Sequence, residues 1–141
     1  RGLGDVYKRQ IEGLTYALRE SKELLEKRSG KSITRLVVSG GGSQSDQVMQ
    51  ITADIFGMPV FRPHTFETSS LGAAISSAVG VGIYPDFTSA VVNMTHQGDC
   101  FEPITTHQVT YNKLYNQVYK KMYRQLKPSY EALHKISEGF F

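Results

Sequence analysis

The chain has only one cysteine, Cys100, so it cannot form an internal disulfide. No apolar run approaches the ~20 residues that cross a bilayer, and no segment resembles a signal peptide. The sequence therefore predicts neither a disulfide scaffold nor a membrane partner. A reducing, cytoplasmic location is the expected one.

The sequence also lacks a recognisable catalytic constellation. Neither Ser43 nor Ser45 lies in a G-x-S-x-G elbow, and no base accompanies them. Asp46 and Asp54 are eight residues apart on one predicted helix, where capping and solvation explain them better than an acid/base pair. Four histidines are scattered without the spacing of metal ligands: His64, His96, His107 and His134. No catalytic residue and no metal ligand is assigned.

Two common phosphate-binding loops are excluded by spacing. The dinucleotide fingerprint requires Gly or Ala at position 45, where this chain has Ser45. Gly30-Lys31-Ser32 ends like a P-loop, but position 25 is Leu25, and the triplet follows a predicted helix instead of opening one. Gly30 is therefore predicted to stop that helix, and Lys31 to be a solvated charge.

The most informative segment is a glycine turn between an apolar run and an amphipathic pattern. The run Leu36–Ser39 leads into Gly40, Gly41 and Gly42, and a helical pattern follows. Bare backbone N–H groups beside a helix N-terminus suit the phosphates of a nucleotide. The alternative is a tight strand-to-helix turn that binds nothing.

The composition is that of a globular domain, with 40% hydrophobic and 21% charged residues. Its first ten residues are interpreted separately, because Asp5–Gln10 is what a transposon-end sequencing adapter encodes when it is translated. Residues 1–10 are therefore expected to be non-native. Without them the net charge falls from +3 to +1. The basic pI is then no evidence for a nucleic-acid partner.

Periodicity predicts an α/β domain. A first helix is expected from Ile11 to about Arg28, followed by a buried strand over 33–39. A second helix follows a capping box formed by Ser43 and Asp46, and it ends at Gly57. The inward faces of the two helices are expected to consist of Ile11, Leu14, Ala17, Leu18, Leu24 and Leu25 in the first, and of Val48, Ile51 and Ile55 in the second.

The second half should begin with an edge strand over 59–62, because Pro59 and Pro63 donate nothing to a ladder. A third helix should start near Thr68, beside Glu67. Its small residues recur every four positions, which favours helix packing over ligand contact: Gly72, Ser76 and Gly80. A short helix over 87–94 and an extended segment over 100–103 should follow.

The last predicted helix interleaves basic residues with tyrosines. Its apolar register is formed by Val109, Leu114, Tyr115, Val118, Met122 and Leu126. Nucleic-acid stacking is one reading of this pattern. The favoured one is an amphipathic helix with tyrosines at its margin and a solvated basic face. Pro128 should kink or terminate it.

Two segments together resemble the C-terminal domain of the FGGY carbohydrate kinases. They are Ala53–Val60 (Ala-Asp-Ile-Phe-Gly-Met-Pro-Val) and Glu67–Ala74 (Glu-Thr-Ser-Ser-Leu-Gly-Ala-Ala), and the glycine turn accompanies them. The resemblance covers residues 11–135 and leaves 136–141 as a tail. It implies the C-terminal lobe of an actin/hexokinase/Hsp70-like, ribonuclease H-like ATPase domain, incomplete at its N-terminus.

The resemblance also implies a function. Members such as xylulokinase, ribulokinase, gluconate kinase and glycerol kinase transfer the γ-phosphoryl group of Mg-ATP to a sugar or polyol. The aspartate that accepts the proton, and much of the sugar site, belong to an N-terminal lobe that this chain lacks. The fragment is expected to be inactive alone and to supply part of the ATP site, without Mg²⁺ ligands of its own.

The resemblance places five residues at the nucleotide: Gly40, Gly41, Gly42, Gln44 and Ser45. The glycines would approach adenosine and the α-phosphate. At position 45 glycerol kinases carry an asparagine that contacts adenine, so Ser45 puts that contact in doubt, and Gln44 is a substitute. The Gly40–Ser43 and Gly57–Val60 segments look xylulokinase-like, so a xylulose- or ribulose-like substrate is expected.

Two other functions stay open. One is a non-catalytic nucleotide-binding or regulatory member of the same superfamily, which the missing upstream sequence would distinguish. The other is a freestanding interaction domain, against which the truncated sheet argues, because an open edge and an uncovered helix face invite aggregation. Homo-oligomerisation is left open.

Overall fold

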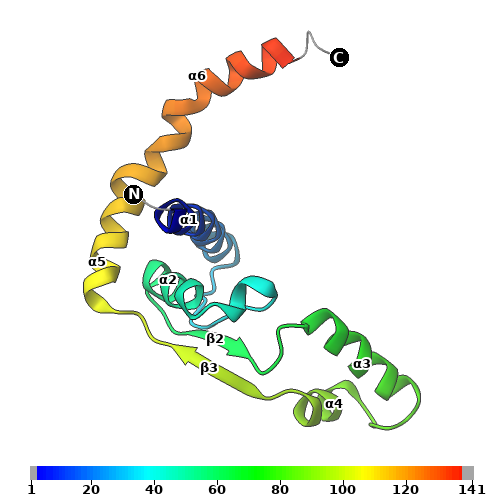
Figure 1. Ribbon diagram of the computed structural model, residues 1–141. Coiled ribbons are helices and arrows are strands. Elements are labelled where there is room, and N and C mark those ends of the chain that lie inside the picture. The colour runs from blue at the N-terminus through cyan, green and yellow to red at the C-terminus, as the bar shows by residue number, and fades with distance from the viewer. Residues whose placement is uncertain (1–2, 138–141) are drawn as a thin grey trace.

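The computed structural model describes residues 3–137, in which a small sheet has helices on one face and beyond its ends (Figure 1). Helix α1 (Leu3–Ser29) runs through residues 3–10 without a break. Its predicted end is confirmed, because Gly30 has a φ of 68° and its N–H donates to the carbonyl of Glu26 at 2.9 Å.

The expected inward face of α1 is wrong. Leu14, Leu18 and Leu25 are exposed, whereas Glu12 and Tyr16 on the other side are buried. Tyrosines from the end of the chain pack against α1 on that side and form the core with Tyr16. Within residues 3–137, the leucine stripe therefore has no partner, and its side chains lie in water.

The sheet has the order β1-β2-β3, formed by β1 (Leu36–Val37), β2 (Val60–Pro63) and β3 (Gln97–Phe101). β1 is parallel to β2, and β3 is antiparallel to it. The predicted strand over 33–39 is thus confirmed only in part. The edge position predicted for 59–62 is wrong, because β2 is the central strand of this sheet. Pro59 precedes β2 and Pro63 ends it, so the residues between them keep their donors.

Helix α2 (Asp46–Phe56) is buried on two sides. Ile55 packs with the tyrosines of the α1 side, and the partly buried Ile51 joins it. Met49 and Ala53 pack on Val60 of the sheet. The predicted inward face is therefore only one of the two buried faces of α2. The helix ends at Gly57, as expected.

Helices α3 (Thr68–Gly80) and α4 (Phe87–Met94) form a pair to one side of the sheet (Figure 1). Both predicted starts are confirmed. Ile75 and Ala78 are the buried side chains of α3. Gly72, Ser76 and Gly80 are exposed, and a Cβ at either glycine would meet nothing within 4 Å. The helix packing expected of this stripe does not occur within residues 3–137.

The chain ends in α5 (Thr105–Leu114), a π-helical turn (Tyr115–Tyr119) and α6 (Lys120–Ser137), which extends away from the body (Figure 1). Pro128 does not terminate the helix, which continues through it to Ser137. Of the expected tail, Ile136 and Ser137 close α6, and residues 138–141 lie outside the described residues. Tyr115 is a core residue, as its place in the apolar register predicts. Tyr111 is buried as well, so the expectation of a marginal position is wrong for this tyrosine.

Because these tyrosines are buried, we expect the protein to lose stability at alkaline pH. Burial raises the pKa of Tyr16 to about 12, above the ordinary value of about 10. The folded state therefore favours the protonated phenol, and this contribution is present below pH ~10 and lost as the pH rises toward 12. We expect Tyr16→Phe to lose less stability than the wild type between pH 10 and 12. Chemical unfolding of the full-length protein measures this, and equal losses would contradict it.

Candidate functional site

The glycine turn connects β1 to α2. Gly40 has φ 91° and ψ 179°, a backbone conformation that L side chains rarely adopt. A single 3₁₀ turn, η1 (Gly41–Gln44), follows, and Ser45 then caps α2. The turn thus directs its exposed backbone past the positive end of α2.

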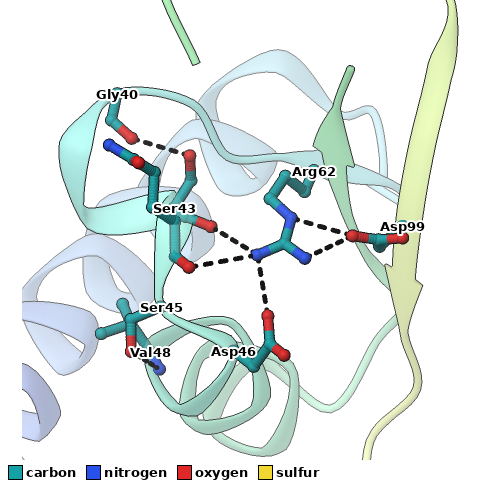
Figure 2. Close-up of polar contacts among 8 residues, drawn as sticks. Gly40, Ser43, Ser45, Asp46, Val48, Arg62 and Asp99 are labelled. Carbon is teal, nitrogen blue, oxygen red and sulfur yellow. Dashed lines mark hydrogen bonds and ion pairs between the residues drawn. The ribbon is translucent and has the colours of Figure 1, made fainter. Parts of the chain in front are cut away.

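Two serines stabilise this turn from within. Ser43 is fully buried, and its Oγ donates to the carbonyl of Gly40 at 2.7 Å (Figure 2). The Oγ of Ser45 accepts from the N–H of Val48 at 3.5 Å. The predicted capping box is therefore wrong, because the 3₁₀ turn draws Ser43 inward and Ser45 takes the cap position.

Arg62 of β2 ties the turn to the sheet. Its Nη1 donates to the carbonyls of Ser43 at 3.1 Å and Gln44 at 3.4 Å, and to Asp46 Oδ1 at 2.8 Å (Figure 2). Its Nε donates to Asp99 Oδ2 of β3 at 3.1 Å, and Nη2 donates to the same oxygen. One guanidinium of β2 thus joins the turn, α2 and β3.

The two carboxylates also set the charge of this cluster. Hydrogen bonds from Arg62 to Asp99 and Asp46 raise the pKa of the guanidinium above its usual value, so it is permanently charged. Arg62 and Asp99 were missed by sequence reasoning. For Arg62 the available signal was a charged residue inside a short, otherwise apolar strand.

The segment before α3 lies against the other end of the turn. The N–H of Gly40 donates to the carbonyl of Phe66 at 3.2 Å, and the hydroxyls of Ser39 and Thr68 are 3.1 Å apart. Glu67 stands at the N-cap of α3 without a side-chain capping bond. The first residues of α3 thus help to hold the glycine turn.

The outer surface of the turn is open. Gly41, Gly42 and Gln44 are exposed, and a Cβ added at Gly41 or Gly42 would meet nothing within 4 Å. A ligand can therefore lie directly against this backbone. The structure brings together four of the predicted residues in one turn: Gly40, Gly41, Gly42 and Gln44. The hydroxyl of Ser45 is instead used in the N-cap of α2.

A separate cavity of about 390 Å³ lies between the start of α1, α2 and α5. Ser45 is the one predicted site residue in its lining, and Gly4, Tyr7 and Lys8 form part of its wall. Those three residues belong to the segment expected to be non-native. The glycine turn is therefore a better candidate for the functional site than this cavity.

Asp54 and His64 each have a defined structural partner. Asp54 is only 2% exposed and accepts a bond from His107 Nδ1 at 2.9 Å, so the expectation that solvation explains Asp54 is wrong. His64 Nδ1 accepts from the N–H of His96 at 3.1 Å. Within residues 3–137, no three His, Cys, Asp or Glu side chains gather where they could hold a metal ion.

Comparison with known proteins decides the family. The model of the FGGY family of carbohydrate kinases, C-terminal domain, matches residues 1–81. The chain belongs to the FGGY family of carbohydrate kinases. The uncharacterized sugar kinase YgcE of Escherichia coli is 35% identical over 92% of this chain, and the xylulose kinase of Lactococcus lactis is 35% identical over 61%.

The fold of this FGGY chain is that of solved sugar kinases. The xylulose kinase of Lactobacillus acidophilus superposes over 87% of the chain with a TM-score of 0.75 and 24% identity. The match spans 24% of that structure, 27% of YgcE and 17% of the Lactococcus enzyme. The chain thus spans about a quarter or less of these relatives' length. None of the helices in the described part of the chain is long and apolar enough to span a membrane.

Proposed function

We propose that this FGGY chain supplies part of the C-terminal nucleotide-binding lobe of an ATP-dependent carbohydrate kinase. The observation that carries the proposal is the glycine turn, which leaves Gly41 and Gly42 open beside the start of α2. Gly40, Gly41 and Gly42 would let adenosine and the α-phosphate approach the backbone. Gln44 has a free amide at the rim, and Ser45 contributes through the helix cap that it forms.

The described residues fit a nucleotide better than they fit Mg²⁺. Asp46 and Asp99 lie near the turn, but both are engaged by Arg62. We therefore propose that Mg²⁺ arrives with ATP and takes its protein ligands from outside this chain. ATP then brings the γ-phosphoryl group, and the chain's own part is to bind and orient its nucleoside end.

In the whole protein we propose transfer of that phosphoryl group to a hydroxyl of a sugar or polyol, in the cytoplasm. The catalytic aspartate and the sugar site would lie in the N-terminal lobe, so residues 11–135 alone would be inactive. The exposed stripe of Leu14, Leu18 and Leu25 supports this, because such a face on a helix normally packs against another part of the protein.

A xylulose- or ribulose-like sugar is the proposed substrate. The Gly57–Val60 segment looks xylulokinase-like, and a xylulose kinase is among the relatives at 35% identity. The test is ATP consumption by the full-length protein against a panel of pentuloses, hexuloses, gluconate and glycerol. Turnover confined to glycerol would overturn the sugar assignment.

The alternative function is a non-catalytic nucleotide-binding or regulatory protein. The turn supports nucleotide binding equally in both cases, so the upstream reading frame distinguishes them. A frame that encodes the catalytic aspartate, with turnover on one sugar, supports the kinase. A frame that lacks it, with a product that binds ATP and is inert on every sugar, supports the alternative.

Gly41→Val tests the binding role of the turn directly. The free protein has room for this side chain, so we expect no loss of thermal stability, but valine would occupy the surface proposed for ATP. ATP affinity of the full-length protein, measured by calorimetry, should fall about tenfold or more. Gly13→Val, which is equally open but lies on α1, is the matched control. Unchanged affinity in Gly41→Val would contradict the site.

We also propose that residues 1–10 are a translated adapter and not native sequence. The proposal is supported by Asp5–Gln10, which is what a transposon-end sequencing adapter encodes when it is translated. Genomic sequencing across this point tests the proposal. Codons for Asp5–Gln10 in a continuous native frame would refute it.

A further inference from the structure

The two ends of the glycine turn are held by different elements. At its start, the N–H of Gly40 is bonded to Phe66, which lies between β2 and α3. At its end, the carbonyls of Ser43 and Gln44 are bonded to Arg62. The segment between them, which includes Gly41 and Gly42, has open space beside both glycines. Besides the bonds within the turn, such as that from Ser43 Oγ to the carbonyl of Gly40, these two attachments fix its course.

Arg62 is itself fixed on several sides. Its side chain is 20% exposed, and its guanidinium lies 5.3 Å from the centre of the Phe101 ring. Asp46 and Asp99 orient the fork through charge-assisted bonds. A lysine at this position would keep the charge but cannot present several donors in one plane.

The same contacts set the charge beside the turn. Nη1 of Arg62 bonds both Asp46 Oδ1 and the carbonyls of Ser43 and Gln44, so the Asp46 carboxylate lies beside the end of the turn. Asp99 adds a second negative charge on β3. When Arg62 is present, its positive charge offsets one of these two negative charges. Without Arg62, both carboxylates would be uncompensated and would oppose the binding of an anionic ligand.

We propose that Arg62 is a positioning residue for the nucleotide. It holds the carbonyl end of the glycine turn in place and offsets one of the two negative charges of Asp46 and Asp99, without touching ATP itself. This inference rests on the proposed function, because it assigns a role to Arg62 only if the turn binds ATP.

The test compares Arg62→Ala, Arg62→Lys and the double variant Arg62→Ala/Asp46→Asn in the full-length protein. Calorimetry with ATP gives the dissociation constant, and kinetics give KM for ATP and for the sugar. We expect Arg62→Ala to weaken ATP binding about tenfold, the scale of lost bonds to a charged group. KM for the sugar should stay within about twofold of the wild-type value, because no sugar site is assigned to this lobe.

The other variants separate charge from geometry. Arg62→Lys should recover part of the affinity through its charge, and Asp46→Asn should do so in the alanine background by removing a negative charge. The matched control is Arg35→Ala, because Arg35 stacks 4.3 Å from the Phe61 ring and contacts no part of the turn. That control should bind ATP like the wild type.

Each outcome is decisive. Arg62→Ala that binds ATP within twofold of wild type overturns the positioning role while the proposed function stands. Equal rises in KM for ATP and sugar overturn it as well, because they indicate a general structural defect. Wild-type protein that binds no ATP overturns the proposed function and this inference together. If Arg62→Ala does not fold, Arg62→Lys decides, because it keeps the charge but loses the planar fork: weaker ATP binding with an unchanged sugar KM supports the role, and wild-type binding opposes it.

Discussion

Gly98→Ala is expected to lower the free energy of unfolding by about 3 kcal/mol, at the upper end of the usual cost of overpacking. A Cβ at position 98 would clash with the backbone carbonyl of Arg62 and would lie 2.9 Å from the carbonyl carbon of Pro63. Backbone atoms cannot rotate away as a flexible side chain can. β2 and β3 must therefore separate here, beside the irregular pairing between Phe61 and Pro63.

The effect should reach the glycine turn, because Asp99 is the next residue and anchors Arg62. Chemical unfolding of the full-length protein measures the stability loss, and ATP calorimetry on the folded fraction measures the effect on binding. Cys100→Ala is the control on the same strand, since its side chain is exposed and the substitution adds no atom. Gly98→Ala within 0.5 kcal/mol of the wild type, a typical surface effect, would contradict the close approach of the strands.

Local signals located most elements of this fold. Gly30 and Gly57 mark the two helix ends that the structure shows, and α3 and α4 begin at the predicted residues. These boundaries depend on residues a few positions apart, through capping and turn conformation. Such signals are present in the sequence regardless of the rest of the fold.

Pairing between distant segments was not predictable in this way. β2 is central because β3, about forty residues later, pairs with it. The buried side of α1 is set by Tyr111 and Tyr115, almost a hundred residues away, so the leucine stripe was mistaken for the inward face. A leucine stripe indicates that a helix face is covered by something, without saying that the partner lies within these residues.

The candidate site likewise has one part that the sequence predicts and another that it does not. The turn was visible as three glycines before a helix, since the demand for a positive φ at Gly40 is local. Arg62 and Asp99 come from two other strands and meet the turn only once the sheet forms. Their role needed the three-dimensional structure.

Asp54 is the clearest case of a residue whose environment the sequence conceals. Its Oδ1 accepts from the backbone N–H of Ile104 at 2.7 Å and from Gln50 Nε2 at 3.0 Å, while Oδ2 accepts from His107 at 2.9 Å. Ile104 is the N-cap of α5 and provides no side-chain capping bond. A carboxylate from α2 thus caps α5 across the interface, where the positive end of that helix favours it.

Asp54→Ala is therefore expected to cost about 3 kcal/mol, because it removes bonds to a charged group and leaves the N–H of Ile104 unpaired. Asp54→Asn keeps one acceptor oxygen and should cost less. His107→Ala should cost about 1 kcal/mol, since His107 is 54% exposed and the other two bonds to Asp54 survive. Chemical unfolding of the full-length protein gives these values, and hydrogen exchange should show faster opening at the start of α5. If Asp54→Ala proved no more costly than His107→Ala, the capping role would be wrong, and α5 would be held by the packing of Tyr111 and Tyr115 alone.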